Sequence, residues 1–286
     1  MDWISDFKVR CSAINKVMAN SQKNPQLTEK KAERLEELEK KQVLTTSQSE
    51  ELAELLVRKA NSSKAILSDT CIAYLMDEYA WREGRRVRVS KEMDIEYLQK
   101  GKLVEQDSIE LLSFIENVPY KKNTERIYND FLSGEPDIFA GESIMSAEKV
   151  TDVKSIWDHP TFLCKLNTGV ANGNTEQLQG YGDITGAKDL EVANCLVNMP
   201  TIQINDYKRR LLYKMEVATE ENPEFKAAWE VMLRSMIFDN IPAHQRVHKI
   251  KIAPFTDFER QAVYDRVKVC REWLNNFHLT YQQLNK

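Results

Sequence analysis

Strand-like runs gather in the middle of this chain, and helical patterns lie before, between and after them. Short runs rich in β-branched and aromatic residues predict strands at 137–140, 148–156, 191–198 and 247–253. Periodic apolar residues predict helices at 1–23, 69–82, 90–117, 174–187, 206–217, 223–237 and 256–276. This arrangement predicts an α/β (α+β) chain with a central mixed β-sheet flanked by helices.

The N-terminal region departs from that pattern. Residues 24–60 are rich in Lys, Glu, Gln and Leu, and the two halves of the stretch repeat one leucine pattern. The repeat predicts an N-terminal helical hairpin, with Ser47 and Glu50 as the capping box of its second helix. We therefore expect an N-terminal helical region at 1–62 and a second domain, which carries the chemistry, at 63–286.

Composition and charge exclude several classes of protein. The five cysteines lie far apart without a C-x-x-C motif, which excludes a disulfide framework and a four-cysteine metal or iron–sulfur site. No apolar run approaches the ~20 residues of a membrane span, and the start MDWISDFKVRC lacks the features of a signal peptide. A cytoplasmic location without membrane contact is expected. A net charge of −4 means that any nucleic acid must be bound by local patches or bound cations.

Two aspartates and a lysine form the most informative constellation. Asp137 opens a short apolar run in GEPDIFAG, and VTDVKSI follows with Asp152 and Lys154. Side chains alternate along a strand, so Asp152 and Lys154 project from one face and Val153 from the other. A hairpin between the two segments would bring both aspartates together, where a divalent cation would relieve their repulsion.

Glu105 is a third candidate acid. It lies on the same helix face as Ile109 and Leu112, so it points inward and needs a partner. Alone, the residue favours a salt bridge with a nearby Lys or Arg. Beside the aspartate pair, a third metal ligand is the better interpretation.

A helix after the lysine strand carries amides and glycines. Gln177 and Tyr181 lie four residues apart on one helix face, with Gln179 between them. Glycines at 180, 182 and 186 are poor helix formers, so they indicate close packing against the sheet or the approach of a ligand backbone.

The order of these motifs resembles the PD-(D/E)XK nuclease superfamily. Glu105 comes first, then Pro136-Asp137, then Asp152-Val153-Lys154, then Gln177 with Tyr181. Within the superfamily, KGKLVEQDSIELL resembles the G-x-x-x-E-x-x-A/S motif of the lambda-exonuclease and YqaJ-type viral recombinase group. QLQGY followed by VANCLVNMP is similar to its Q-x-Q-G-Y helix and to its strand ending in N-x-P. The resemblance runs from roughly residue 68 to residue 200.

The resemblance implies a restriction-endonuclease-like core and a metal-dependent deoxyribonuclease. It implies one or two Mg²⁺ or Mn²⁺ ions held by Glu105, Asp137, Asp152 and the main-chain carbonyl of Val153. Lys154 would contact the attacking water or the scissile phosphate. Gln177 or Gln179 would steer the substrate or the lysine, and Tyr181 would support them.

The resemblance also implies a biological role. It suggests an exonuclease on linear duplex DNA in phage-type recombination, with a single-strand annealing protein as partner and a homo-oligomer, a ring trimer, as the assembly. A phage-encoded chain would then act in the bacterial host cytoplasm. The alternatives are a structure-specific or CRISPR-adaptation-type endonuclease and a non-catalytic DNA-binding protein on the same fold.

The candidate site is acidic and would repel DNA, so basic clusters elsewhere are needed to bind the phosphates. Four arginines fall within seven positions, at Arg82, Arg85, Arg86 and Arg88. Lysines and arginines near 121–126 and at 208–210 are the alternatives. Contacts of this kind bind phosphates without reading the sequence. The arginine run is the expected DNA-binding site.

Overall fold

The computed structural model describes residues 3–19, 27–41, 43–63, 67–88, 96–170 and 173–283. They divide into two compact units. Unit one contains Met1–Arg88, Tyr128–Ser133 and Phe255–Lys286, and unit two contains Val89–Ile127 and Gly134–Pro254. Unit one thus joins the first 88 residues to the last helix of the chain. The division into 1–62 and 63–286 stays a prediction.

Unit two is built on a four-stranded mixed sheet, as predicted. The strands are β4 (Ile138–Ala140), β5 (Lys149–Ser155), β6 (Asp189–Cys195) and β7 (Val247–Ile252). They lie in the order β4-β5-β6-β7, and only the central pair β5–β6 is parallel. All four strands fall on the stretches predicted from β-branched composition. Most residues of the two central strands are buried, as expected for strands that have a neighbour on each side and helices on both faces.

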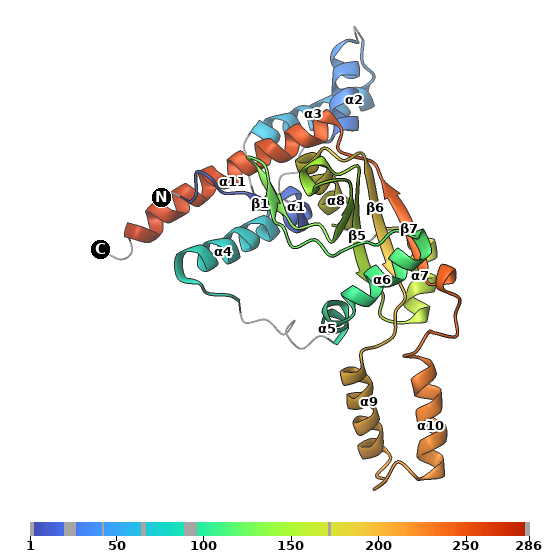
Figure 1. The fold of residues 1–286 in the computed structure, drawn as a ribbon. Helices are drawn as coiled ribbons and strands as arrows, with labels where there is room; N and C mark the ends of the chain where they lie inside the picture. Colours follow the sequence, from blue (N-terminus) through green and yellow to red (C-terminus); the bar gives the residue numbers. More distant parts are fainter. Residues whose placement is uncertain are drawn as a thin grey trace. The chain divides into compact units, whose positions relative to one another are not determined.

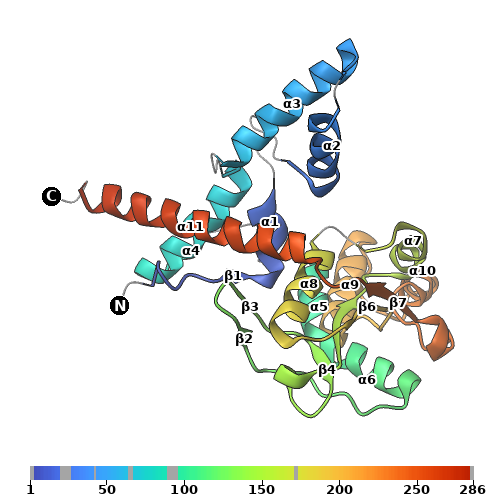
Figure 2. The same cartoon turned by 90° about the horizontal axis from the view of Figure 1, so that it is seen from above.

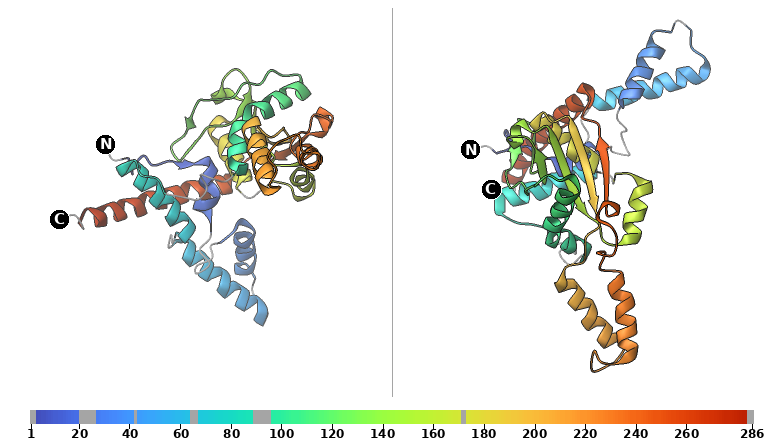
Figure 3. Two further views of the ribbon diagram at one scale, coloured as in Figure 1. Left: turned by 90° about the horizontal axis from the view of Figure 1, so that it is seen from below. Right: turned by 45° about the vertical axis from the view of Figure 1, so that its right-hand side comes forward.

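Helices cover both faces of this sheet. Unit two contains α5 (Glu96–Leu103), α6 (Glu105–Glu116), α7 (His159–Thr168), α8 (Asn174–Thr185), α9 (Thr201–Lys214) and α10 (Pro223–Arg234). Figures 1 and 2 show α6 on one face of the strands and α8 on the other. Figure 3 shows α9 and α10 side by side in a hairpin that extends away from the strands. The stretch predicted as one helix at 90–117 contains both α5 and α6.

The two faces of β5 meet different helices. Val153 packs with Ile109 and Leu112 of α6 in an apolar cluster. On the same face, Ser155 Oγ lies 2.7 Å from Ser108 Oγ of α6. Asp152 faces α8 instead, where Gln177 contacts it. The alternation predicted from the sequence is therefore confirmed, and it separates the apolar face of β5 from its charged face.

Unit one is mainly helical. Its helices are α1 (Ile14–Met18), α2 (Glu29–Glu39), α3 (Thr46–Ser63), α4 (Asp69–Gly84) and α11 (Asp257–Gln283). β1 (Val9–Arg10) pairs in parallel with β3 (Leu132–Gly134), and β2 (Ile127–Tyr128) precedes β3 in the chain. The predicted helical hairpin is confirmed, because α2 and α3 pack through Leu35, Leu38 and Leu55. No described helix in either unit combines the length and apolar character needed to span a bilayer.

Two local predictions in unit one are wrong. Residues 1–23 were expected to form one helix, but Val9 N donates to Phe131 O in a strand pairing. A short 3-10 helix follows at Cys11–Ala13, and the α-helix begins only at Ile14. A long-range backbone pairing has overridden the local apolar spacing. The capping box of α3 also lies two residues earlier than expected. Gln48 N donates to Thr45 Oγ1 at 3.3 Å, and Thr45 N donates to Gln48 Oε1 at 3.2 Å.

Candidate active site

The β4–β5 hairpin brings Asp137 and Asp152 to one place. Ile138 pairs with Thr151, so Asp137, just before β4, lies beside the middle of β5. The main-chain N–H of Val153 donates to Asp137 Oδ2 at 2.6 Å. Asp152 is only 1% exposed. The hairpin that the sequence predicted is thus present and holds both carboxylates at its charged face.

Lys154 completes this group. Its Nζ lies 2.7 Å from Asp152 Oδ2 in an ion pair. Burial disfavours the ammonium form of Lys154, but the charges of Asp152 and Asp137 outweigh that effect and raise its pKa. Burial, followed by the charge of Asp152, raises the pKa of Asp137 to about 7. Lys154 therefore does not fully offset the cost of ionising Asp137 beside Asp152 in this site.

Of the two glutamines, only Gln177 contacts the aspartates. Its Nε2 donates to Asp152 Oδ1 at 3.2 Å and to the Tyr181 hydroxyl at 2.8 Å. Tyr181 in turn donates to the main-chain carbonyl of Glu135 at 3.3 Å. Gln179 Nε2 donates elsewhere, to the carbonyl of Ala253 at 3.2 Å. The amide, the phenol and the carboxylate form one chain of hydrogen bonds from α8 to β5.

Glu105 stands at the first residue of α6 and is held by a lysine. Lys122 Nζ lies 2.5 Å from its Oε2. The Glu105 charge still reaches the aspartate pair, since it is among the influences that raise the pKa values of Asp137 and Lys154. Within the described ranges, no three His, Cys, Asp or Glu side chains are gathered closely enough to hold a metal ion. The ion pair that the sequence left open is present, and Glu105 as a third ligand stays a prediction.

The aspartate pair itself fits a hard divalent cation. Within the described part of the chain, no hydrogen bond reaches the buried Asp152 Oδ2, and its contact is the Lys154 ion pair. Asp137, just before β4, lies close enough for the charge of Asp152 to raise the pKa of its carboxylate. Carboxylate oxygens that repel one another in a buried place are the ligand type that Mg²⁺ and Mn²⁺ prefer.

The arginines expected to bind DNA lie in unit one. Arg88 Nη2 lies 2.9 Å from Asp77 Oδ1 in an ion pair, and the Arg85 guanidinium lies 5.1 Å from the Trp81 ring centroid. Arg82 lies 5.0 Å from the Trp3 ring centroid. Arg86 belongs to the same exposed stretch after α4. Their role in DNA binding stays a prediction.

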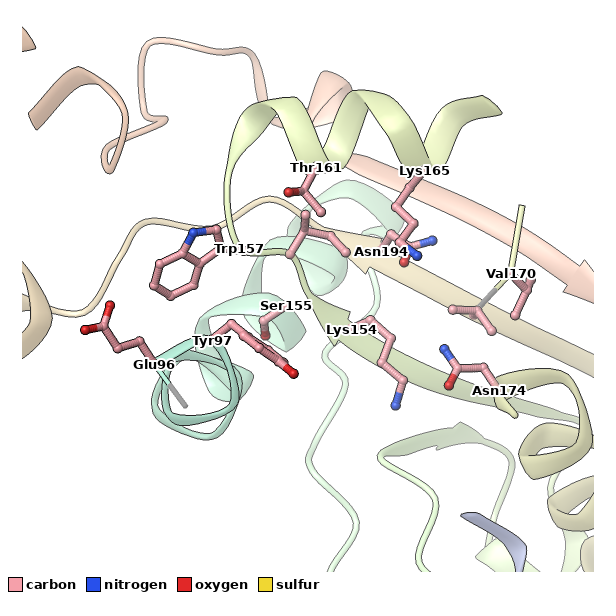
Figure 4. Close-up of a pocket in the computed structure, with 12 residues that line it drawn as sticks. Glu96, Tyr97, Lys154, Ser155, Trp157, Thr161, Lys165, Val170, Asn174 and Asn194 are labelled. Atoms are coloured by element: carbon pink, nitrogen blue, oxygen red, sulfur yellow. The ribbon is translucent and has the colours of Figure 1, made fainter. Parts of the chain in front are cut away.

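The sequence did not predict the cavity of about 930 Å³ that lies beside Lys154. Its lining includes Asn194, which the register of the sheet places directly opposite Lys154. Figure 4 shows Lys154 in the middle of this cavity. The signal in the sequence was Asn194 itself, a polar residue within the apolar run VANCLV, where its amide is buried. The helix α7, which forms another wall, was not predicted either, although Asp158 and Pro160 are ordinary helix-start residues.

Comparison with known proteins supports the fold. No protein-family model matches the sequence, and a search of curated proteins found no match. A phage-related exonuclease from Haemophilus somnus 129PT has a similar structure, with a TM-score of 0.62 at 18% identity, over 96% of this chain and 97% of that chain. An alkaline exonuclease from Laribacter hongkongensis matches with a TM-score of 0.54 at 10% identity, over 97% and 94% of the two chains. Its complex with dAMP matches with a TM-score of 0.52 at 11% identity, over the same shares.

These matches extend over nearly the whole chain, well beyond the stretch that carries the motifs. They confirm the resemblance to the lambda-exonuclease group at the level of the fold. The chain therefore has the fold of the phage-related and alkaline exonucleases.

Proposed function

We propose that this chain is a metal-dependent deoxyribonuclease that acts as an exonuclease on linear duplex DNA. One observation carries the proposal: the buried Asp152 of β5 and the partly buried Asp137, just before β4, share a site with the ammonium group of Lys154. The fold supports it, since two proteins with this fold are named exonucleases. One of them was crystallised with dAMP, a DNA mononucleotide, which supports DNA as the substrate.

Each residue has a role that follows from its surroundings. Asp137 and Asp152 would hold Mg²⁺ or Mn²⁺, with Glu105 and the Val153 carbonyl as further oxygen ligands. A bound cation of this kind lowers the pKa of a coordinated water and offsets charge on the phosphate. Neighbouring acids keep Lys154 protonated, so it donates hydrogen bonds to phosphate oxygens and stabilises negative charge as it develops.

The remaining residues position the carboxylates and the DNA. Gln177 fixes the orientation of Asp152, and Tyr181 fixes Gln177. Arg82, Arg85, Arg86 and Arg88 would contact phosphates away from the reacting bond. The role in phage-type recombination, with an annealing protein and a ring trimer, is proposed on the resemblance alone.

Incubation with linear and circular duplex DNA tests the proposal. With Mg²⁺, the wild-type chain should degrade linear DNA and leave closed circles intact, and a chelator should stop the reaction. Lys154→Ala should lower the rate by about 10²–10³-fold, because it removes a charged donor from the developing phosphate charge. Lys226→Ala is the matched control, since Lys226 is a lysine of α10 that pairs with Glu221.

Two results would contradict the proposal in different ways. Cleavage of circles would favour an endonuclease on the same site. Tight DNA binding by wild type without cleavage in Mg²⁺ or Mn²⁺ would favour a non-catalytic DNA-binding protein.

A further inference from the structure

The cavity beside Lys154 has two chemically different ends, and it lies within unit two. One end is aromatic, formed by Tyr97 of α5 and by Trp157 just after β5, with Glu96 beside them. The other end is mainly polar, with Lys165, Asn174 and Asn194 beside the apolar Val170. Figure 4 shows the aromatic and polar groups on opposite sides of Lys154. A ligand that fills this cavity therefore meets flat apolar rings and polar groups at the same time.

The backbone at Trp157 is firmly held. Lys100 is fully buried, and its Nζ donates to the carbonyls of Ile156 and Trp157, each at 2.8 Å. A third bond, to the carbonyl of Val197 at 2.9 Å, uses the last ammonium hydrogen. The same Nζ lies 6.0 Å from the Trp157 ring centroid. Lys100 thus ties the segment after β5 to the segment after β6 and fixes one wall of the cavity.

Tyr97 is held through its neighbour. The main-chain carbonyl of Glu96 accepts from Gln203 Nε2 at 2.8 Å, and the Glu96 carboxylate accepts from Arg210 and Tyr207. These contacts fix the start of α5 against α9. The Tyr97 side chain itself stays 57% exposed. Across the described residues, neither Tyr97 nor Trp157 makes a ring contact with another aromatic side chain.

The polar end contains a cation without a counter-charge. Of the residues that the structure describes, none forms an ion pair with Lys165. An ammonium group that lines a cavity beside Lys154 attracts an anionic ligand. The volume of about 930 Å³ falls within the range typical of small-molecule sites, about 300–1,000 Å³.

We propose that the aromatic end of this cavity binds one unpaired nucleobase of the strand whose phosphate lies at Lys154. This inference rests on the proposed nuclease function and adds a base-binding site to it. The base stacks on Tyr97 and Trp157, and Lys165 contacts a neighbouring backbone phosphate. Stacking of this kind accepts every base, because each has a π face. A base must leave its pair to enter a cavity, so the site holds a single strand.

Equilibrium binding in a chelator tests the inference without cleavage. The probe is a short single-stranded DNA oligonucleotide that carries 2-aminopurine, whose fluorescence falls when the base stacks. We expect wild type to quench the probe, and Tyr97→Leu or Trp157→Leu to weaken binding about tenfold, within the range measured for base–aromatic stacking. Trp157→Phe should retain most of the affinity. Tyr213→Leu is the matched control, because Tyr213 is 87% exposed on α9 and lies outside the cavity.

An abasic oligonucleotide separates stacking from general damage to the fold. Removing the base should weaken binding to wild type about tenfold, but should cause no further loss in the Tyr97→Leu, Trp157→Leu double variant. Equal affinity of wild type for the normal and abasic probes would overturn the inference. Cleavage assays separate this inference from the proposed function. If Tyr97→Leu and Trp157→Leu both keep nuclease activity and quench the probe as wild type does, the base-binding site is overturned and the nuclease function is not. Base-dependent binding without any cleavage would support the site and contradict the proposed function.

Discussion

Gln177 and Gln179 lie two residues apart on α8 but have different surroundings. Gln177 Nε2 donates to Asp152 and Tyr181, whereas Gln179 Nε2 donates to the carbonyl of Ala253. Gln177→Ala would release the Asp152 carboxylate from its fixed orientation. We expect activity to fall about 10–100-fold, as is typical when a group that orients a metal ligand is removed. Gln179→Ala is the matched control, and an equal loss in both variants would contradict this assignment.

Glu116 gives a prediction for stability against pH. Its carboxylate accepts from Lys249 Nζ and from the Tyr120 hydroxyl, each at 2.6 Å, with Lys149 Nζ 3.3 Å away. Burial opposes ionisation, but these partners outweigh it and lower the pKa of Glu116 from 4.5 to about 2. A pKa that is lower in the folded state stabilises the fold above pH 4.5, and this contribution is lost as the pH falls toward 2.

Glu116→Gln should therefore lower the free energy of unfolding by about 1–3 kcal/mol at neutral pH. The difference from wild type should shrink as the pH falls between 4.5 and 2. Urea denaturation at several pH values measures both effects. A difference that stays constant with pH would show that the lost packing of the side chain, and not its charge, matters.

At the residue scale, the sequence predicted the positions of the site residues that depend on one strand and its hairpin. Alternation along β5 placed Asp152 and Lys154 on one face, and the hairpin placed Asp137 beside them. The partners that come from distant segments could not be predicted. Lys122 reaches Glu105 from 17 residues away, and Lys100 reaches Val197 from 97 residues away. Such contacts depend on how helices pack, which spacing within one segment does not encode.

At the element scale, the packing of α8 on β6 depends on Gly182. A Cβ at this position would lie 2.8 Å from Leu190 Cδ1 and 3.2 Å from the carbonyl of Ala187. Gly182→Ala should therefore push α8 away from the sheet and destabilise the fold by about 1–3 kcal/mol. The sequence had left two explanations for the glycines of this helix, and at Gly182 the close packing is observed.

Gly101→Ala is the matched control for that experiment. Gly101 also lies inside a helix, α5, and a Cβ there would meet no heavy atom within 4 Å. Alanine should raise helix stability at that site by about 0.5–1 kcal/mol. Urea denaturation of both variants should thus give shifts of opposite sign. A stabilised Gly182→Ala variant would mean that α8 moves to accommodate the methyl group at little cost.

The predicted elements failed where tertiary contacts overrode local pattern. All four strands of the main sheet and the helices α8 to α11 were located from composition and periodicity. β1 was read as helix because Phe7, Cys11 and Ile14 have helical spacing, and all three are indeed buried. The prediction that these residues are buried was correct, but the prediction of a helical backbone was wrong. β1 is extended because it pairs with a strand more than 120 residues away. α7 was missed between a strand and a glycine-containing loop.

At the scale of the whole molecule, each compact unit is built from separate stretches of the chain. Unit one collects the N-terminal segment, a six-residue stretch at Tyr128–Ser133 and α11, while unit two holds the sheet and all the acids of the candidate site. The sequence could not predict how the chain divides into these units, because its composition changes near residue 62 and not at the edges of the units. The motifs, in contrast, all fall in unit two, so their order along the chain was enough to predict the fold.

A cation bound by acids from separate elements should stabilise the folded chain as a whole. Asp137 and Asp152 are apart in the unfolded chain, so the ion binds the folded state preferentially and raises its unfolding temperature. At a free Mg²⁺ concentration ten times the Kd, linkage gives about 1.4 kcal/mol, and Tm should rise by about 3–6 °C. Thermal unfolding with and without chelator measures this shift independently of any nuclease activity.

The Asp152→Asn variant should lose most of that shift, because an amide replaces a charged ligand while the shape of the side chain is kept. Asp265→Asn is the matched control, since Asp265 is an exposed aspartate of α11 that pairs with Lys268. Its shift should equal that of wild type. An equal rise in Tm for Asp152→Asn and wild type would mean that Mg²⁺ binds elsewhere and would contradict the assignment of Asp152 as a metal ligand.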